Sequence, residues 1–434
     1  MSKTKSMVLL GSSVVLLASA ALAWQGVERQ LKDLDLTKFS KALGSYFEAK
    51  AEGKGVLEAE VEVSDEAQAL GRKLAKAKST DILAFPADLG QALWLSHDYP
   101  RKKFKKGKVT EVTYTERFYS KDNPLEFVVA LPNNYQPKER WPVILAIPPA
   151  DQKPGQHLGE DWESGDFRDG AILAVPTMPS KVEDWTDRAG TAAVLVTLQQ
   201  VMENYAVDPD RVYLAGTGDG VRVALALSSR YSWMFAGVIG RRGDAGEVSA
   251  AGFCNLPSYL AGGGAQATAF EAKVKELGFG NCTLAPSADL PSLWTWMQAH
   301  PRVSYPSKID FWPSLDLVRS NWLEISRGSA SEGAHIQASI DAGSNTITIE
   351  GSGVPSVTVH LTDALVDLDR PLRILANGVS KEVKVVRSLK LFTDKAFFGQ
   401  IDAGQVYVAS ELVSLPAQAT EGGEKAGEGE EGGK

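Results

Sequence analysis

The sequence predicts a protein of the α/β class: a mostly parallel sheet with helices on both faces, a helical N-terminal region and a C-terminal β-sandwich-like region. Three observations predict it. Between residues 108 and 302, short apolar runs alternate with helical patterns, as expected for strands buried on both faces. Before this region, apolar residues recur at helical spacing. After it, short β-type runs follow one another between turn residues.

The chain of 434 residues is long enough for two or three folded units. We expect a signal peptide, a helical region packed on the main domain, an α/β domain, a β-rich domain and a disordered tail. Their bounds are residues 1–23, 24–107, 108–302, 303–416 and 417–434. The tail consists mainly of Glu, Gly and Lys, so it lacks the apolar side chains needed for a core.

The expected elements can be placed in order. In the N-terminal region, the spacing of Leu36, Phe39, Leu43 and Phe47 predicts a helix, and a second helical pattern surrounds Leu70. The expected strands of the α/β region are residues 109–118, 125–131, 143–147, 171–175, 212–215, 235–239, 258–261 and 282–285. The expected helices there are residues 189–205, 221–230, 268–277 and 293–299, with a long loop at 151–169.

The pattern of the C-terminal region predicts strands separated by turns. The expected strands are residues 308–311, 322–326, 335–340, 346–350, 356–361 and 371–376. Asn377-Gly378 is a strong hairpin signal, because both residues readily take a positive φ. Residues 383–415 are expected to be helical or mixed.

The N-terminus has the features of an export signal. Lys3 and Lys5 precede the apolar run Met7–Ala23, which ends in Ala21-Leu22-Ala23, a sequence suited to a signal peptidase. An uncleaved membrane anchor is the alternative, since the run is close to the length of a membrane span. Both interpretations place the body of the protein outside the cytoplasm: secreted, periplasmic, or anchored and facing outwards.

Charge and motif content limit the classes of partner that we expect. The net charge of −8 gives no basic footprint, so nucleic acid is not an expected partner. The basic cluster at residues 101–106 is interpreted as a surface linker, with contact to an anionic surface as the alternative. No residues with metal-ligand spacing occur, so neither a metal nor a cofactor is expected. The partner, an unknown protein or small-molecule ligand, is not identified by the sequence.

The segment with the most informative pattern is Gly216-Thr217-Gly218-Asp219-Gly220, which joins an apolar strand directly to a helix. This is the setting of a nucleophile elbow, Gly-x-Ser-x-Gly, in which the residues two before and two after the nucleophile must be small. Gly216 and Gly220 meet that demand. The central residue, Gly218, has no side chain to act as a nucleophile.

The lead-in Tyr-x-Val-Asp-Pro-x-Arg-Val-Tyr-Leu at residues 205–214 resembles that of bacterial secreted α/β-hydrolases related to esterases, polyhydroxybutyrate depolymerases and dienelactone hydrolases. The resemblance spans roughly residues 108–302 and implies an α/β-hydrolase-like fold. In that family a Gly-His-Ser-x-Gly elbow usually follows. Thr217 therefore stands where histidine is common, and Gly218 stands where the serine is expected.

The other two members of the triad are sought by their order in the fold, Ser, then acid, then His. The acid belongs after strand 258–261, where Gly262–Gln266 contains no carboxylate and Ala265 occupies the expected place. The histidine belongs after strand 282–285, where Ala288 stands instead. A serine-type mechanism needs all three groups within hydrogen-bond reach, and all three positions are vacant.

The oxyanion hole is also incomplete in the sequence. Its donors would be the amide of Asp219 and an amide after strand 143–147, but Pro148 and Pro149 have no N–H. Ala150 or Asp151 can still donate. An aspartate nucleophile at Asp219 would place the bulky Val221 at a flanking position of the turn, so we interpret Asp219 as a helix cap.

Few residues remain as pocket candidates at the carboxyl ends of the strands. His157 is the one histidine of five considered for a pocket; surface exposure is its alternative. His300 is interpreted as a structural helix end, and His97, His335 and His360 as residues without a chemical role. The full set of pocket candidates is Thr217, Gly218, Asp219, Asp151, His157, Gln266 and Asp289.

The chain has two cysteines, Cys254 and Cys282, which lie near the starts of two successive expected strands. Parallel neighbouring strands would bring them to one edge of the sheet, and an oxidising compartment would permit a disulfide. Two buried free thiols are the alternative.

Three hypotheses about function follow. The leading one is an exported, non-catalytic relative of the esterases (a pseudo-esterase) that acts in binding or envelope assembly. The second is an active hydrolase of esters or short peptides that uses Asp219, Asp289 and His157. The third is a structural envelope protein held by its N-terminal apolar segment.

Overall fold

The computed structural model describes residues 28–97, 99, 105–116, 119–180, 182–315, 317–398 and 402–416. The expected signal peptide and the tail beyond residue 416 lie outside the described residues, as do residues 101–104 of the basic cluster. Within the described part of the chain, no helix is both long enough and apolar enough to cross a membrane.

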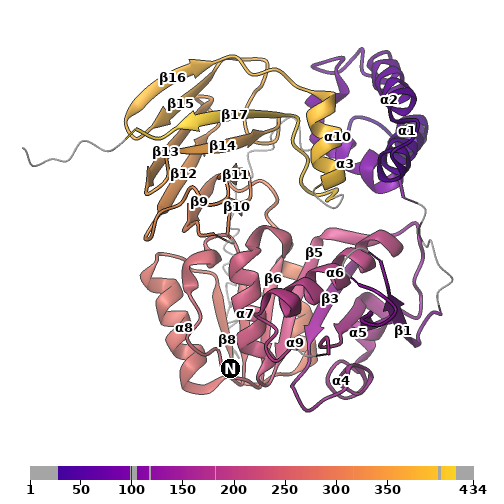
Figure 1. The fold of residues 1–434 in the computed structure, drawn as a ribbon, viewed down its shortest axis with the longest axis vertical. Helices are drawn as coiled ribbons and strands as arrows, with labels where there is room; N and C mark the ends of the chain where they lie inside the picture. Colours follow the sequence, from indigo (N-terminus) through magenta and orange to yellow (C-terminus); the bar gives the residue numbers. More distant parts are fainter. Residues whose placement is uncertain are drawn as a thin grey trace, which may run out of the picture.

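An eight-stranded sheet forms the centre of the α/β region (Figure 1). Its strands are β1 (Val109–Tyr114), β2 (Leu125–Ala130), β3 (Trp141–Ile147), β4 (Ile172–Pro176), β5 (Val207–Thr217), β6 (Gly237–Arg241), β7 (Ser258–Ala261) and β8 (Cys282–Ala285). They lie in the order β1-β2-β4-β3-β5-β6-β7-β8. β2 runs antiparallel to both of its neighbours and the other pairs are parallel. This order is that of the α/β-hydrolase fold, so the expected fold class is confirmed.

Helices cover both faces of this sheet. On one face they are α4 (Pro154–Asp161), α5 (Gly165–Gly170) and α9 (Leu290–Ala299), and on the other α6 (Arg188–Asn204), α7 (Gly220–Arg230) and α8 (Gly264–Glu276). Two short 3-10 helices, η2 (Ser232–Met234) and η3 (Ala250–Phe253), lie in the connections. The burial of every residue of β3 and β4 follows from this double cover.

The expected long loop at residues 151–169 is wrong, because this segment folds into α4 and α5. Both helices are short, at 8 and 6 residues, and neither has a side-chain cap. Leu158 and Phe167 turn into the core beneath the sheet, so tertiary burial stabilises these helices rather than local signals.

Two further sheets form the C-terminal β-sandwich-like region. One has the order β10 (Arg319–Ser320), β11 (Leu323–Glu324), β14 (Ser356–Leu361) and β17 (Ala409–Ser414). The other has the order β16 (Val379–Val383), β15 (Leu372–Ala376), β13 (Thr346–Ser352), β12 (His335–Asp341) and β9 (Lys308–Phe311). All pairs are antiparallel except β13 with β15. Asn377 and Gly378 have φ values of 45° and 81° and join β15 to β16 in the expected hairpin.

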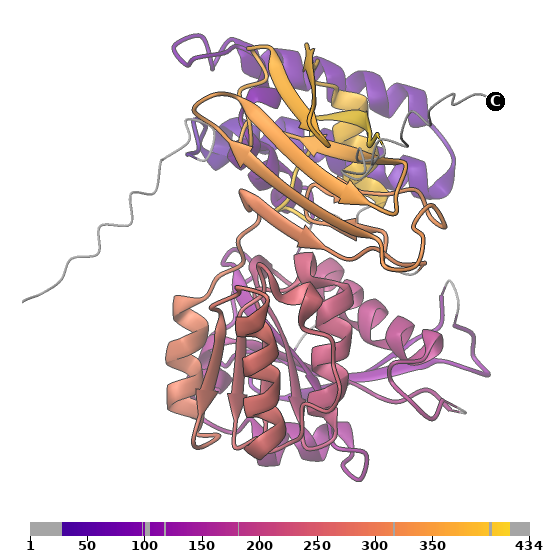
Figure 2. The same ribbon diagram turned by 90° about the vertical axis from the view of Figure 1, so that its left-hand side faces the viewer.

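The N-terminal helices pack on this β-rich region, as Figures 1 and 2 show, and not on the large sheet. They are α1 (Asp33–Glu52), α2 (Val56–Gly71), η1 (Ile82–Ala84) and α3 (Pro86–Leu95). Phe47 of α1 stacks on Phe397 of α10 (Leu389–Phe398), with ring centroids 6.4 Å apart. The expectation that these helices pack on the main domain is therefore wrong, apart from Trp94, whose indole N–H donates to the Val207 carbonyl. Helical spacing shows which face is apolar but not which surface covers it.

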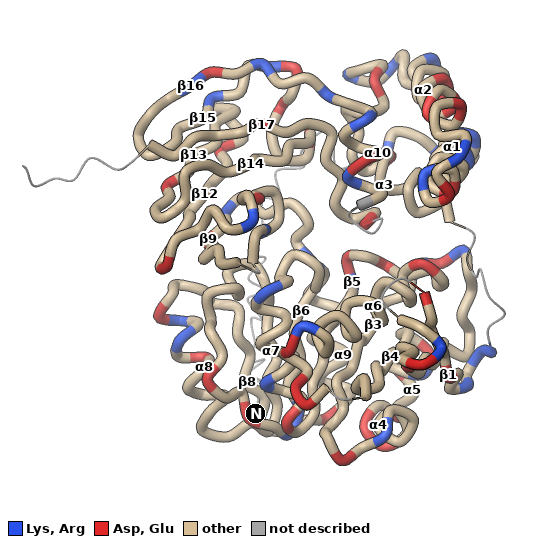
Figure 3. Tube along the Cα trace, viewed as in Figure 1, with Lys and Arg blue, Asp and Glu red and all other residues tan. Residues whose placement is uncertain are grey.

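Charged residues of both signs are interspersed along α1 and α8 in the view of Figure 3, whereas those of α2 are all acidic. Strand interiors in the same view are mostly uncharged, in keeping with their burial.

Candidate functional site

The turn between β5 and α7 has the backbone of a nucleophile elbow. Gly218 has a φ of 59°, and its N–H donates to the carbonyl of Arg241 at 3.0 Å. The flanking glycines are required by space: a Cβ at Gly216 would collide with the Gly220 backbone, and one at Gly220 would lie 2.7 Å from the Ile147 carbonyl oxygen. The elbow predicted from the glycine spacing is therefore present as a backbone feature.

The position of Gly218 itself has room for a side chain. A Cβ there would meet only the Pro149 ring, at 3.5 and 3.6 Å, which is ordinary van der Waals contact. The left-handed φ would cost a non-glycine residue about 1–2 kcal/mol. Space around the elbow thus accommodates a nucleophile that the chain does not supply.

The carboxylate of Asp219 accepts a hydrogen bond from the amide that an oxyanion hole would use as a donor. The Ala150 N–H, on the loop after β3, donates to the Asp219 carboxylate at 3.2 Å. Asp219 stands at the N-cap position of α7 but makes no side-chain cap hydrogen bond, so its expected capping role is wrong. Its φ and ψ of −65° and −22° are helical, and the vertex of the turn is Gly218.

The places expected for the acid and the histidine contain neither. Ala265 and Gln266 do not lie in a loop, as expected, but in the first turn of α8, where both are exposed. Ala288, in the histidine place, offers only its carbonyl, which accepts from Arg241 Nη2 at 3.2 Å. Asp289 caps α9 by accepting the Ser292 N–H at 2.9 Å, and this hydrogen bonding lowers its pKa. Asp289 is therefore engaged in helix structure.

His157 does not line a pocket mouth or the surface, because its side chain is 0% exposed. Its Nδ1 lies 2.9 Å from the carboxylate of Asp161, and its Nε2 accepts from the indole N–H of Trp162 at 3.2 Å. Burial, with the charges of Arg241 and Arg242, lowers its pKa to about 4. His157 is consequently neutral at neutral pH, and both ring nitrogens have partners.

Arg241, at the carboxyl end of β6, fills the space beside the elbow. Its side chain is 3% exposed, and its Nη1 donates to the Asp161 carbonyl at 2.6 Å while Nη2 reaches Ala288. The guanidinium lies 4.9 Å from the centre of the Trp162 ring, and burial lowers its pKa to about 10. Arg241 therefore joins α4 to the loop after β8 across the edge of the sheet.

The sequence interpretation missed this buried group, although a charged residue directly after an apolar strand was its one local signal. The Asp161 carboxylate pairs with His157 and with Arg242, whereas Arg241 bonds to the backbone carbonyl of the same residue. These contacts tie α4, the end of β6 and the loop after β8 together, although the buried Nε of Arg241 has no hydrogen-bond partner among the described residues.

The remaining pocket candidates are not gathered into a site. Thr217 is buried, and in the described part of the chain its hydroxyl has no hydrogen-bond partner. Asp151 is exposed on the loop after β3. None of the seven candidates lines any of the five cavities described for the molecule.

The proposed disulfide is absent, since Cys254 and Cys282 are both free thiols. Their partners differ: the thiol of Cys254 bonds to the backbone of Asp310 on β9, and that of Cys282 lies beside the hydroxyl of Ser258. Burial raises the pKa of each thiol. The interpretation as two partly buried thiols therefore replaces the disulfide.

Two other histidines have structural partners. His335 stacks on Trp312 at 4.2 Å between ring centroids and pairs with Asp310. His300 ends α9, as expected, with Nδ1 2.7 Å from the Trp296 carbonyl oxygen.

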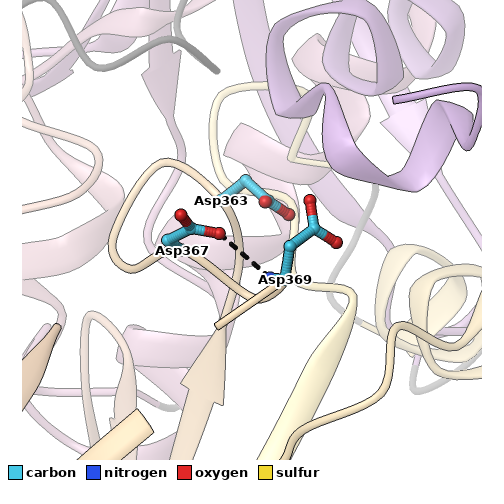
Figure 4. A group of neighbouring side chains, drawn as sticks. All are labelled: Asp363, Asp367 and Asp369. Carbon is cyan, nitrogen blue, oxygen red and sulfur yellow. Dashed lines mark hydrogen bonds between the residues drawn. The ribbon is translucent and has the colours of Figure 1, made fainter. Parts of the chain in front are cut away.

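Three neighbouring carboxyl groups, Asp363, Asp367 and Asp369, lie in the loop between β14 and β15 (Figure 4). Asp363 and Asp369 both pair with Arg387, at 2.6 and 2.7 Å. The Asp367 carboxylate accepts the N–H of Asp369 at 3.0 Å. Because two of the three carboxylates are paired with Arg387 and the third accepts a backbone N–H, we assign the cluster to loop structure.

The structure does contain a cavity that no sequence feature indicated. It measures about 240 Å³ and lies where α6 and η2 meet α3, β10 and α10. Its polar side chains include Arg302, Arg319 and Lys395, and most of the rest of the wall is aliphatic or aromatic.

Comparisons with known proteins give likenesses of structure only. A scan of protein-family models gave no match. A search of curated proteins also gave none. A crystal structure of a thermostable esterase matches at 14% identity and a TM-score of 0.37, over 45% of this chain and 63% of that chain.

Two ferulic acid esterase structures are also similar to the chain. One, from Anaeromyces mucronatus, matches at 13% identity and a TM-score of 0.32, over 45% of this chain and 90% of that chain. The other matches at 15% identity and a TM-score of 0.35, over 44% and 94%. The chain thus spans less than two thirds of the thermostable esterase. On the strand order of its own sheet, it has an α/β-hydrolase-like fold with two further sheets.

Proposed function

We propose that this protein is an exported, non-catalytic relative of the esterases that acts by binding, either of a ligand or of a partner in envelope assembly. The observation that carries the proposal is the elbow itself. Its backbone is formed and its vertex has room for a side chain, yet the vertex is Gly218 and the neighbouring oxyanion donor, Ala150 N–H, is bonded to Asp219.

The surroundings of the elbow support the same proposal. The carboxyl edge of the sheet is filled by Arg241, which bonds to the backbone of Asp161 and of Ala288. Catalysis of acyl transfer needs donors aimed at an oxyanion and a base beside a nucleophile. Here the Ala150 N–H is bonded to Asp219, and two N–H groups of Arg241 are bonded to backbone carbonyls.

The alternative of an active hydrolase with unconventional residues is disfavoured by the contacts of its three candidates. Asp219 accepts from Ala150, Asp289 caps α9, and His157 is enclosed between Asp161 and Trp162. A general base must reach the proton that it removes, and a fully buried imidazole with two partners does not.

Export is part of the proposal and rests on the sequence of residues 1–23. Fractionation of cells that express the full chain tests it. Recovery outside the cytoplasm supports export, whereas recovery of all the protein in the cytoplasm contradicts it. Membrane-bound protein with the N-terminal segment intact would favour the anchored form.

The non-catalytic character is tested with a reagent that traps nucleophiles. Purified protein is incubated with an alkyl fluorophosphonate, and its intact mass is measured beside that of a serine esterase as positive control. We expect no added mass on the wild type. One adduct per chain, mapped by peptide mass to the segment 216–220, would overturn the proposal, because it would show an activated nucleophile at the elbow.

A further inference from the structure

We propose that the cavity between α6 and α10 binds a small amphipathic carboxylate, with the anionic group at Arg319 and the apolar part along α6. This rests on the proposed function in one respect: it names a ligand for a protein that binds rather than catalyses. The cavity involves no residue of the elbow.

The cavity joins the two main parts of the molecule. α6, η2 and the start of β5 come from the α/β region, whereas α3, α10 and the segment 402–407 belong to the other part, above α6 in Figure 1. Ligand sites occur preferentially at such junctions. With about 240 Å³, the cavity is smaller than the roughly 300–1,000 Å³ typical of drug-sized ligands, so it fits a small molecule.

One part of its wall is apolar and comes from several elements. Leu195, Leu198 and Met202 project from α6, and Leu93 and Phe392 come from α3 and α10. Leu195 and Met202 are only partly buried although they belong to a helix that covers the sheet. These side chains give an alkyl or aryl group a surface on which to bury its area.

Two of the three cations in the wall are compensated. Arg302 donates to the carboxylates of Asp210 and Asp402. Lys395 pairs with Glu324 at 2.9 Å and lies 3.1 Å from the His360 ring nitrogen. Neither cation needs a further anion.

Arg319 is the cation without a counter-charge. Its Nε donates to the Asn321 carbonyl at 3.0 Å, Nη2 reaches the amide oxygen of Gln405 at 3.5 Å, and the hydroxyl of Tyr407 lies beside the guanidinium. All three partners are neutral. Among the described residues no carboxylate forms an ion pair with it. Its guanidinium lies over two rings that also line the cavity, those of Trp233 at 5.8 Å and Tyr407 at 5.6 Å.

This arrangement favours a carboxylate over other ligands. A guanidinium presents paired N–H groups that match a carboxylate, and the flanking rings hold its plane in place. An apolar anion would then satisfy both the unpaired charge and the aliphatic wall. A neutral alkyl chain would leave the charge unsatisfied, and a short anion would leave the wall in contact with water.

Arg319 also lines a second cavity of about 370 Å³, which includes Arg222 and Arg230 and is more polar. An anion without an apolar part would suit that cavity better. The experiment therefore has to distinguish the two cavities.

The test is calorimetric titration of the full chain with octanoate, beside octanol, which lacks the charge, and acetate, which lacks the chain. We expect octanoate to bind and each comparison molecule to bind about tenfold more weakly or worse, since one charge-assisted hydrogen bond is worth at least that factor. Arg319→Met should raise the octanoate Kd about tenfold or more, because it keeps the apolar stem and removes the charge. Arg370→Met, an exposed arginine of the loop before β15, is the matched control and should leave the Kd unchanged.

Filling each cavity separately locates the site. Leu195→Trp, in the first cavity alone, should abolish binding, and Ser232→Leu, in the second alone, should not. The proposal is overturned if octanoate does not bind, if octanol binds equally well, if Arg319→Met binds as the wild type does, or if only Ser232→Leu loses binding. Failure here leaves the trapping experiment unaffected, and an active elbow nucleophile would refute the proposed function without bearing on octanoate binding.

Discussion

Arg302 connects the two main parts of the molecule, and its loss should weaken that connection measurably. Its side chain is 3% exposed and follows α9. It donates to Asp210 at the start of β5, to Asp402 in the segment after α10, and to the carbonyl of Trp233 at 3.1 Å. Burial acts to lower its pKa, but the carboxylates of Asp402 and Asp210 hold the pKa above its usual value. Arg302 is thus charged at every pH of interest.

The expected magnitude follows from this geometry. Removing one partner of a fully buried ion pair costs about 3–5 kcal/mol, mainly because the other charge is left unpaired. Asp210 and Asp402 are 37% and 22% exposed, so water can solvate part of the charge left behind. We therefore expect Arg302→Ala to lower the free energy of unfolding by about 2–4 kcal/mol.

The assay is urea unfolding followed by tryptophan fluorescence, with Arg370→Ala as the control for an exposed arginine. The control should change the free energy of unfolding by less than about 0.5 kcal/mol. A change for Arg302→Ala within the range of the control would refute the stabilising role of Arg302, because a buried arginine with two carboxylate partners would then contribute nothing.

Three further predictions concern other contacts. His157 has a pKa of about 4 in the folded protein, below its ordinary 6.5, so the unfolded chain binds the extra proton first. The part of the free energy of unfolding that depends on a neutral His157, about 3 kcal/mol, is fully present above pH 6.5 and is lost as the pH falls to 4. His157→Gln should therefore flatten the loss of stability measured over that range. An unchanged slope would contradict the assignment. In the elbow, Gly220→Ala should destabilise by more than about 2 kcal/mol through its clash with a backbone carbonyl, whereas Gly218→Ala should cost about 1–2 kcal/mol. Thermal melting of both variants checks this, and equal effects would rule out the elbow geometry. Titration with a thiol reagent in denaturant, without reductant, should find both Cys254 and Cys282 reactive. If neither thiol reacts, the result supports a disulfide between them.

Sequence patterns predicted the elements whose cause is local. β7 and β8 begin and end at the expected residues, because short apolar runs between turn residues leave little choice. The elbow followed from Gly216 and Gly220, since only glycine fits where the backbone approaches this closely.

What escaped prediction depends on contacts between distant segments. Periodicity identified the apolar face of α1 but could not show that it meets α10, more than three hundred residues later. The same holds for His157, whose environment is set by Trp162 and by an arginine from β6. The cavity around Arg319 had no sequence signal, because its walls come from eight separate parts of the chain that only the fold brings together.

Ester turnover measures directly whether the elbow supports catalysis. Purified wild-type protein is assayed with short-chain 4-nitrophenyl esters beside Asp219→Asn, His157→Gln and a triple variant, Gly218→Ser with Ala265→Asp and Ala288→His. We expect that the wild type does not exceed the uncatalysed rate and that neither single substitution changes it. Activity of the triple variant alone would show that the frame survives. Wild-type turnover that falls on substitution of Asp219 or His157 would contradict the proposed non-catalytic role and establish an unconventional hydrolase.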